Sequence, residues 1–191
     1  MTDATFHDSE DFKSFRFGSE NTLAKNYENC SFHSCDLSNQ SLEGVMFADC
    51  DFTDCNLSMS KLHETSFQDC SFKNCKLVGL DFSVCKTFLL SFTFIDCQLN
   101  LSSFFRLKLR AIKFTGSDLT EADFAEADLQ KADFTNTNLN GAIFDNTIVE
   151  GADFRTADGY SLDPIRNYIT AAKFSQENLV GLVAHLNIEL Q

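Results

Sequence analysis

The chain has 191 residues, of which 43% are hydrophobic, and it carries a formal net charge of −13. It can therefore bury a core, while its negative charge disfavours binding to nucleic acid or to anionic membranes, which would repel it. The sequence lacks both the roughly 18 consecutive apolar residues of a membrane-spanning helix and a basic, then apolar, leader at its acidic start. We expect a cytoplasmic protein with basic protein partners, and proteins that grip DNA are one such class.

The first residues introduce a phenylalanine-rich pattern. The chain contains 21 Phe but a single Pro and no Trp, which indicates that Phe serves as a repeated structural part. Around Phe12, Phe17 and Tyr27 the spacing of the aromatic residues is still irregular. We therefore expect residues 1–26 to form an N-terminal cap and an irregular first coil.

Residues 27–158 repeat with a period of twenty residues, which is subdivided into fives. The twenty-residue segments that start at Cys30, Cys50 and Cys70 align with one another. One position in every five holds Phe or Leu, and the position two residues earlier holds a smaller residue, mostly Cys at first and Ala later. A period of five fits neither an α-helix nor a flat strand. It fits a chain that turns a corner every five residues, points two side chains inward on each side, and completes a square in twenty.

Such square coils are expected to stack into a column with a continuous core. Each coil would hydrogen-bond to the next at a strand spacing of about 4.8 Å, so about seven coils would give a column on the order of 34 Å long. No single coil would be stable without its neighbours. The phenylalanines that we place in this core are Phe32, Phe52, Phe72, Phe114, Phe124, Phe134, Phe144 and Phe154.

The repeat changes frame near residues 83–98. The large residues Phe82 and Leu99 are not separated by a multiple of five, and two extra residues lie between them. Phe92 and Phe94 then compete for one inward position. We expect a bulge or a kinked coil at this frame break.

The eight cysteines admit three interpretations: metal ligands, a disulfide framework, or small core residues. Seven of them occupy the small inward position on two sides of the square, whereas zinc ligands come in CxxC-type spacing with four converging thiolates. We interpret the cysteines as reduced and buried, and expect Cys85, at the frame break, to be the most accessible. His33 and His63 face opposite sides and cannot share a metal, so we expect no metal site.

Acidic residues gather between positions 118 and 158, where ten of them stand against Lys131 and Arg155, a local net charge of −8. Any one Asp before a core position is explained most simply as a solvated corner residue. Duplex DNA carries about one charge per 1.7 Å, or about twenty over 34 Å, and the net charge of −13 over a rod of similar length is of the same order. Imitation of DNA is thus physically reasonable, although ordinary solubility would also produce an acidic surface. A small basic group, Arg106 to Lys113, has no assigned role. The acids that we predict to bind a partner are Asp118, Glu121, Asp123, Glu126, Asp128, Asp133, Asp145, Glu150 and Asp153.

The tail, residues 159–191, no longer follows the repeat. Apolar residues from Leu179 to Leu186 have helical spacing and Ser175 is a suitable N-cap, which predicts a C-terminal α-helix that covers the last coil. Further apolar residues remain, and exposed apolar surface commonly marks an interface. We therefore expect the tail to cap the coil and to form a homodimer through Ile165, Tyr168, Leu179, Leu182, Val183, Leu186, Ile188 and Leu190.

The segment ADFAEADLQKADFTNTNLNGAIF is close to the consensus A(D/N)LXX, and from about residue 27 to residue 156 the chain resembles the pentapeptide-repeat family. The resemblance implies an all-β fold, a right-handed quadrilateral β-helix. The segments FLLSFTFIDCQLN and LDPIRNYITAAKFSQENLVGLVAHLNIEL are similar to regions of Qnr-type quinolone-resistance proteins and of immunity proteins against gyrase-poisoning toxins. Those relatives form tail-to-tail dimers that resemble DNA and bind DNA gyrase or topoisomerase IV.

This resemblance implies a non-enzymatic DNA mimic that binds DNA gyrase or topoisomerase IV and protects against, or modulates, poisons such as quinolones or peptide toxins. The chain lacks the long loops of the Qnr type and is more similar to the loopless immunity branch, which leaves protection and inhibition both open. The alternative is a repeat scaffold for another basic protein. Because the sequence has no nucleophile elbow, no Gly-rich phosphate loop and no carboxylate pair beside a pocket, we expect neither enzymatic activity nor a cofactor.

Overall fold

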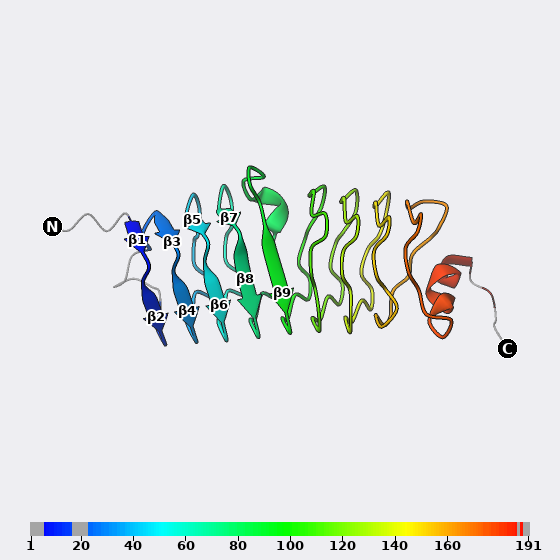
Figure 1. Cartoon of the computed structure of the whole chain (residues 1–191), viewed down its shortest axis with the longest axis horizontal. Helices are drawn as coiled ribbons and strands as arrows, with labels where there is room; N and C mark the ends of the chain where they lie inside the picture. The colour runs from blue at the N-terminus through cyan, green and yellow to red at the C-terminus, as the bar shows by residue number, and fades with distance from the viewer. Residues whose placement is uncertain (1–5, 17–22, 187, 189–191) are drawn as a thin grey trace.

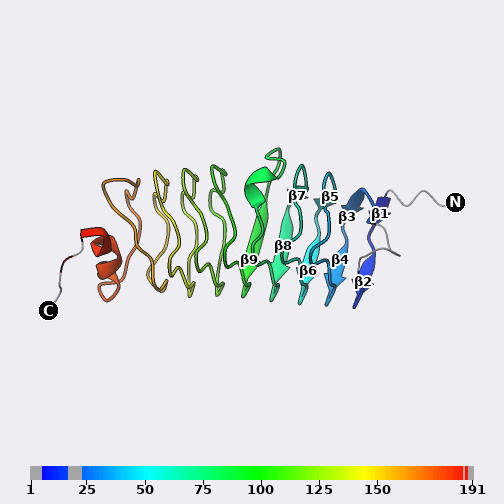
Figure 2. The same cartoon turned by 180° about the vertical axis from the view of Figure 1, so that it is seen from behind.

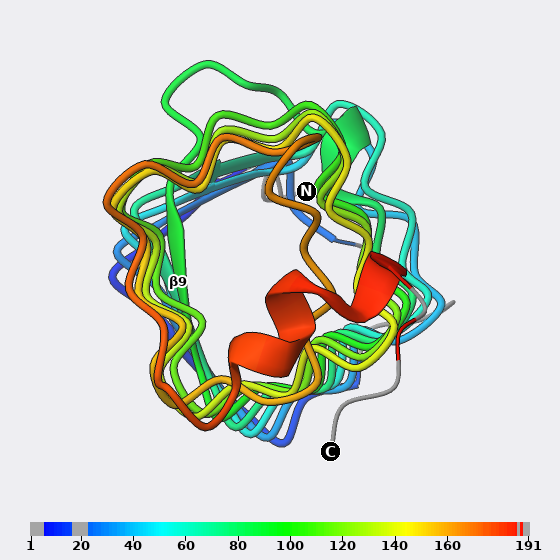
Figure 3. The same ribbon diagram turned by 90° about the vertical axis from the view of Figure 1, so that its right-hand side faces the viewer.

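The protein is a right-handed quadrilateral β-helix. Its structure, a computed structural model, describes residues 6–16, 23–186 and 188. The coils follow one another along a single axis, from β1 (Phe6–Asp8) at one end to the C-terminal turns at the other (Figure 1, Figure 2). Seen along that axis, successive coils superpose in one closed outline (Figure 3). In the described part of the chain, no helix is long and apolar enough to cross a membrane.

Two parallel sheets form two sides of the first coils. One sheet has the strand order β1-β3-β5-β7 and the other the order β2-β4-β6-β8-β9. Residues twenty apart face each other, as in the pairs Phe12↔Phe32 and Phe32↔Phe52. The strands after β1 are β2 (Asp11–Lys13), β3 (Asn26–Glu28), β4 (Ser31–His33), β5 (Met46–Ala48), β6 (Asp51–Thr53), β7 (Ser66–Gln68), β8 (Cys70–Lys73) and β9 (Phe92–Ile95).

Beyond β9 the coils continue as single parallel bridges separated by tight turns. The bridges Asp133↔Asp153 and Asp153↔Lys173 keep the offset of twenty residues. A turn such as Leu119–Ala122 is closed by a hydrogen bond from the Ala122 amide to the Leu119 carbonyl, and its third residue, Glu121, has a φ of 57°. That is the conformation of a type II turn. A corner every five residues thus shortens each side to one bridging residue.

The core consists of stacked aromatic rings. The eight phenylalanines that the sequence places in the core are all buried, and none is more than 7% exposed. Because burying one such side chain contributes about 1.5–3 kcal/mol, their repetition stabilises the whole column. One stack, with centroids 4.6–5.6 Å apart, runs through Phe12, Phe32, Phe52, Phe72, Phe94, Phe114, Phe134, Phe154 and Phe174. Each coil contributes one ring to this stack of nine, so the solenoid is slightly longer than the seven coils expected.

Up to the frame break, Cys, Ser and Thr in the small inward position donate a hydrogen bond to a carbonyl of the preceding coil. The Thr65 hydroxyl donates to the Leu42 carbonyl at 2.7 Å, and the Cys85 thiol donates to the Leu62 carbonyl at 3.8 Å. All eight cysteines are free and buried. Cys85 is the most exposed of the eight, as expected, but it is only 5% exposed because it continues the column of Thr65.

The two extra residues of the frame break leave the solenoid as a loop before β9. Strand β9 pairs with β8 at an offset of twenty-two residues, with Cys70↔Phe92 and Phe72↔Phe94. Phe94 therefore stacks on Phe72 while Phe92 takes the position that Cys70 has one coil earlier, and both are buried. The expected competition between Phe92 and Phe94 for one position does not occur. A short 3₁₀ helix, η1 (Phe82–Val84), comes before the 86–91 loop, which projects outside the coil outline (Figure 3).

The tail covers the last coil, but not as an α-helix. It forms two 3₁₀ helices, η2 (Leu179–Leu182) and η3 (Ala184–Leu186). The Ser175 hydroxyl accepts a hydrogen bond from the Asn178 amide at 3.2 Å, as an N-cap would. However, the Gly181 carbonyl accepts from the Leu162 amide of the last coil, and Gly181 lies directly against Tyr160. This docking replaces α-helical hydrogen bonding and explains why the predicted helix is absent.

Candidate protein-interaction surface

The predicted acidic residues encircle the solenoid. Asp118, Asp123, Asp128 and Asp133 each precede a successive core residue, and each forms a parallel bridge to the next coil. Because successive core residues lie on successive sides of the square, one of these aspartates lies on each side. The structure therefore brings the acids together as an acidic belt around the coils of residues 118–158 and not as a single face.

Arginine pairs with part of this acidic belt. One of the paired acids, Asp128, is only 7% exposed, so it offers little surface to a partner. Because the arginine of each pair is largely exposed, such pairs contribute about 0–1 kcal/mol each, but they reduce the charge available for binding. The four pairs, each at 2.7 Å, are Arg106–Glu126, Arg110–Asp128, Arg166–Asp145 and Arg155–Asp153. Arg106 and Arg110 thus gain partners in the coil that follows them.

The other predicted acids form no ion pair within the described residues: Asp118, Glu121, Asp123, Asp133 and Glu150. Asp118 is the best ordered of them, because its carboxylate accepts hydrogen bonds from Thr120 at 2.6 Å, Asn100 at 2.8 Å and Asn138 at 3.1 Å. Partial burial raises the pKa of Asp118, but these hydrogen bonds outweigh it and lower the pKa below its ordinary value. Asp118 is therefore charged at neutral pH.

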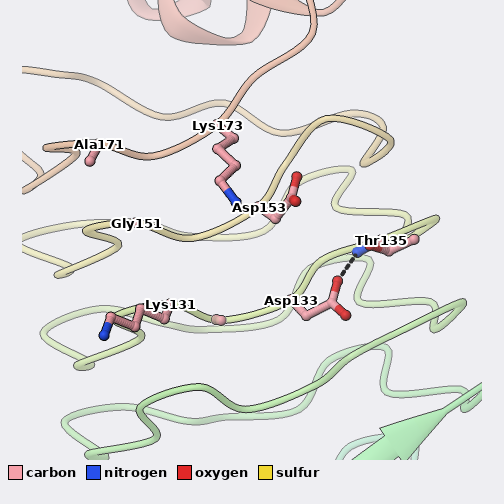
Figure 4. Close-up of a pocket in the computed structure, with 8 residues that line it drawn as sticks. Lys131, Asp133, Thr135, Gly151, Asp153, Ala171 and Lys173 are labelled. Carbon is pink, nitrogen blue, oxygen red and sulfur yellow. Dashed lines mark hydrogen bonds between the residues drawn. The ribbon is translucent and has the colours of Figure 1, made fainter.

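A shallow groove of about 560 Å³ crosses one side of the acidic belt (Figure 4). It is hollow because Gly151 and Ala171 provide little or no side chain at the corner above Lys131. Asp133 accepts a hydrogen bond from the Thr135 amide at 2.9 Å. Asp153 lies one coil on, paired with Arg155, whose guanidinium lowers the pKa of Asp153. The charged residues that line the groove are thus the two carboxylates and two lysines, Lys131 and Lys173.

The C-terminal end carries the second predicted surface. Leu182 and Val183 are half-buried, and Leu182 packs against the core. Leu190 lies outside the described residues. Val180, which the assumed α-helical spacing missed, is also 53% exposed. The other predicted interface residues are exposed: Ile165, Tyr168, Leu179, Leu186 and Ile188.

A third exposed apolar feature, which the sequence analysis missed, lies on the 86–91 loop. Phe88 is 75% exposed and Leu89 is 62% exposed. The signal was present in the sequence, because both are large apolar residues at the frame break that fit neither inward position. Leu90, in contrast, packs partly against the core and anchors the loop.

Solved structures with the same architecture are similar to the chain over nearly its whole length. A trypsin-treated form of QnrB1, described as a plasmid-mediated fluoroquinolone resistance protein, is 18% identical, covering 98% of this chain and 99% of that chain with a TM-score of 0.62. Full-length QnrB1 is also 18% identical, covering 96% of this chain and 100% of that chain with a TM-score of 0.53. At this identity the likeness shows a shared fold.

Sequence comparison gives the family directly. No curated protein sequence matches the chain significantly. A family model described as a pentapeptide repeat region matches residues 25–93, and a model described as pentapeptide repeats (8 copies) matches residues 102–141 and 122–158. These matches cover most of the solenoid, so the chain belongs to the pentapeptide-repeat family.

Proposed function

We propose that the chain is a non-enzymatic DNA mimic that binds a type II topoisomerase, either DNA gyrase or topoisomerase IV. In doing so it protects the enzyme from poisons such as quinolones or peptide toxins, or modulates their effect. The observation that carries the proposal is the acidic belt, in which five predicted carboxylates have no ion pair among the described residues. A DNA-binding saddle lined by Lys and Arg attracts such a surface. The shared fold with QnrB1 supports the proposal.

The charge density of the acidic belt is comparable to that of DNA. In the coil of residues 118–137, six acids stand against Lys131, a net charge of −5. One coil rises about 4.8 Å. Over that length duplex DNA, with about one charge per 1.7 Å, carries about three charges. Arg106 and Arg110 of the preceding coil neutralise two of these acids, which leaves a net charge of −3 and therefore about the local charge that DNA offers.

The exposed tail residues complete the proposed assembly. Ile165 is 88% exposed and Leu186 is 52% exposed at the end nearest the acidic belt. In a homodimer that buries these tails, the two acidic belts lie near the centre of a rod twice as long and the N-terminal coils lie at its ends. Such a dimer offers a continuous acidic stretch to a two-fold symmetric topoisomerase in the cytoplasm.

The test is a comparison of charge reversals at matched positions. Glu121 and Glu150 form no ion pair in the described structure, so reversing them leaves the arginine pairs intact. The double variant Glu121→Lys/Glu150→Lys should bind gyrase at least tenfold more weakly than the wild type at low salt. It should also lose its effect on quinolone inhibition in a supercoiling assay, while its far-UV circular dichroism stays unchanged.

The control is Glu64→Lys/Glu43→Lys, which makes the same charge change at the equivalent turn positions of two earlier coils. Glu64 has a φ of 56°, against 57° for Glu121. This control should retain most of the binding. The proposal is rejected if the wild-type protein binds neither gyrase nor topoisomerase IV at low salt, or if both double variants bind as the wild type does. The acidic belt would then belong to a scaffold for another basic protein.

A further inference from the structure

We infer that the chain carries a second protein-binding site of opposite charge, formed by the 86–91 loop and the coil of residues 98–117. It would take an acidic peptide segment that contains a large apolar side chain. The coil of residues 98–117 contains four basic residues and no acid, although the whole chain has a net charge of −13. It lies directly before the acidic coil and directly after the projecting loop. This inference does not depend on the identity of the partner of the acidic belt.

The loop and this basic coil enclose a pocket of about 340 Å³, which is lined by Thr87, Leu90, Arg106 and Lys108. Among the described residues, none that lines the pocket carries a carboxylate. Pockets of this size hold small ligands or a few side chains. The charged part of the lining is therefore purely cationic, which favours an anionic group as the occupant.

The two cations differ in how they are held. The Arg106 guanidinium donates to Glu126 at 2.7 and 3.2 Å and lies 4.6 Å from the centroid of the Phe105 ring, so its position is fixed. Lys108 is exposed and makes no ion pair with the described residues. Lys108 is thus the cation of the pocket that is available to a ligand, whereas Arg106 is held in place and forms part of the pocket wall.

The apolar rim of the pocket identifies the class of ligand. Phe88 and Leu89 expose most of their side chains next to Thr87 and Leu90, which line the pocket. A free anion would leave this apolar surface in water, and the net charge of the chain repels a nucleic acid. A peptide that places an acidic side chain on Lys108 and an apolar side chain on Phe88 would use both features.

The inference is tested with a fluorescein-labelled peptide, Glu-Asp-Leu-Phe-Asp-Glu, titrated with the full chain at low salt. We expect saturable binding and, in the ¹⁵N-labelled protein, amide shifts confined to the loop and the basic coil. Lys108→Glu and Phe88→Ser should each weaken binding at least tenfold. Lys61→Glu, which makes the same charge change at an exposed lysine of an earlier coil, should leave affinity within twofold.

Several outcomes would overturn the inference. These are the absence of binding, equal affinity for Lys-Lys-Leu-Phe-Lys-Lys, or amide shifts centred on the tail. Inorganic phosphate or a single-stranded oligonucleotide that reproduces the same shifts would show an anion site without peptide selectivity and would also overturn it. Because Phe88 is exposed on the loop, its variant tests the inference even if Lys108→Glu fails to fold.

Discussion

At the scale of single residues, a core phenylalanine such as Phe124 connects three coils. The Phe124 ring stacks on Phe104 and on Phe144, each with centroids 5.2 Å apart. It also meets Phe114 and Phe134 edge-on at 5.6 and 6.0 Å. Such ring pairs contribute beyond the area that they bury. Stability is therefore concentrated in the inward residues, while outward residues are free to vary in charge.

Replacing Phe124 by Ala should lower the free energy of unfolding by about 3–5 kcal/mol, because it removes buried apolar surface and leaves a cavity between two coils. Urea denaturation followed by circular dichroism measures this change. Phe88→Ala, which truncates the same kind of side chain on the exposed loop, should change stability by less than about 0.5 kcal/mol. A loss below about 1 kcal/mol for Phe124→Ala would contradict the inward assignment.

At the scale of elements, the five-residue period predicted the coils and the frame break near residues 83–98, but it did not predict how the chain accommodates that break. Inward positions follow from spacing alone, because residues twenty apart must stack. The spacing located the two extra residues between Phe82 and Leu99 but not which residues form the loop, and both phenylalanines of β9 proved to be buried. Helical spacing in the tail was misleading, because the Gly181 carbonyl hydrogen-bonds to the last coil. The conformation of the tail depends on its contacts with the last coil, and the local sequence pattern of the tail does not reveal these contacts.

Within the tail, the structure separates a residue that packs against the core, Leu182, from exposed residues to which we assign dimerisation, such as Ile165 and Leu186. Ile165→Asp combined with Leu186→Asp alters exposed residues, so it should give a folded monomer with an almost unchanged melting temperature. Leu182→Asp alters a residue that packs against the core, so it should lower the melting temperature. Sedimentation equilibrium at micromolar concentration measures the mass of each variant. Ile143→Asp, which places the same charge on an exposed residue of a coil side, should remain dimeric.

A wild-type protein that sediments as a monomer at micromolar concentration would contradict the dimer. A dimer that persists in the Ile165→Asp/Leu186→Asp variant would place the interface elsewhere on the molecule. In that case the exposed residues of the 86–91 loop, Phe88 and Leu89, would be the next apolar surface to test.

At the scale of the whole molecule, charge is arranged in bands along the axis. The basic coil of residues 98–117 is followed by the acidic coil of residues 118–137. The sequence predicted the acidic belt, but not which of its acids are paired. Arg106–Glu126 joins residues twenty apart, which the period could have revealed. Arg110–Asp128 joins residues eighteen apart, which occupy different positions of the five-residue repeat. Such a pair depends on side-chain direction, which spacing alone does not give.

Carboxylates whose pKa is lowered by folding make the stability of the protein depend on pH. Hydrogen bonds from Ser38 lower the pKa of Asp36, and Arg155 lowers the pKa of Asp153. For Asp118, hydrogen bonds from Thr120 and its neighbours outweigh the effect of burial and also lower the pKa. A carboxylate whose pKa is lowered by folding stabilises the native state above its ordinary pKa of about 4, and this stabilisation is lost as the pH falls through the lowered value.

Protonation of the surface also relieves the mutual repulsion of a chain with a net charge of −13, so the pH dependence of the wild type alone mixes two opposite effects. Comparison with Asp118→Asn isolates one of them. In this variant an amide nitrogen would face either Asn100 or Asn138, both of which donate to Asp118, so its melting temperature at pH 7 should be lower than that of the wild type. Between pH 5 and about pH 2.5 the difference between the two proteins should shrink, because acid removes the charged acceptor from the wild type alone.

Glu121→Gln, which removes an exposed carboxylate without an ion pair in the described structure, controls for the change in net charge. A difference between wild type and Asp118→Asn that stays constant as the pH falls would show that the Asp118 carboxylate does not stabilise the coils through its charge.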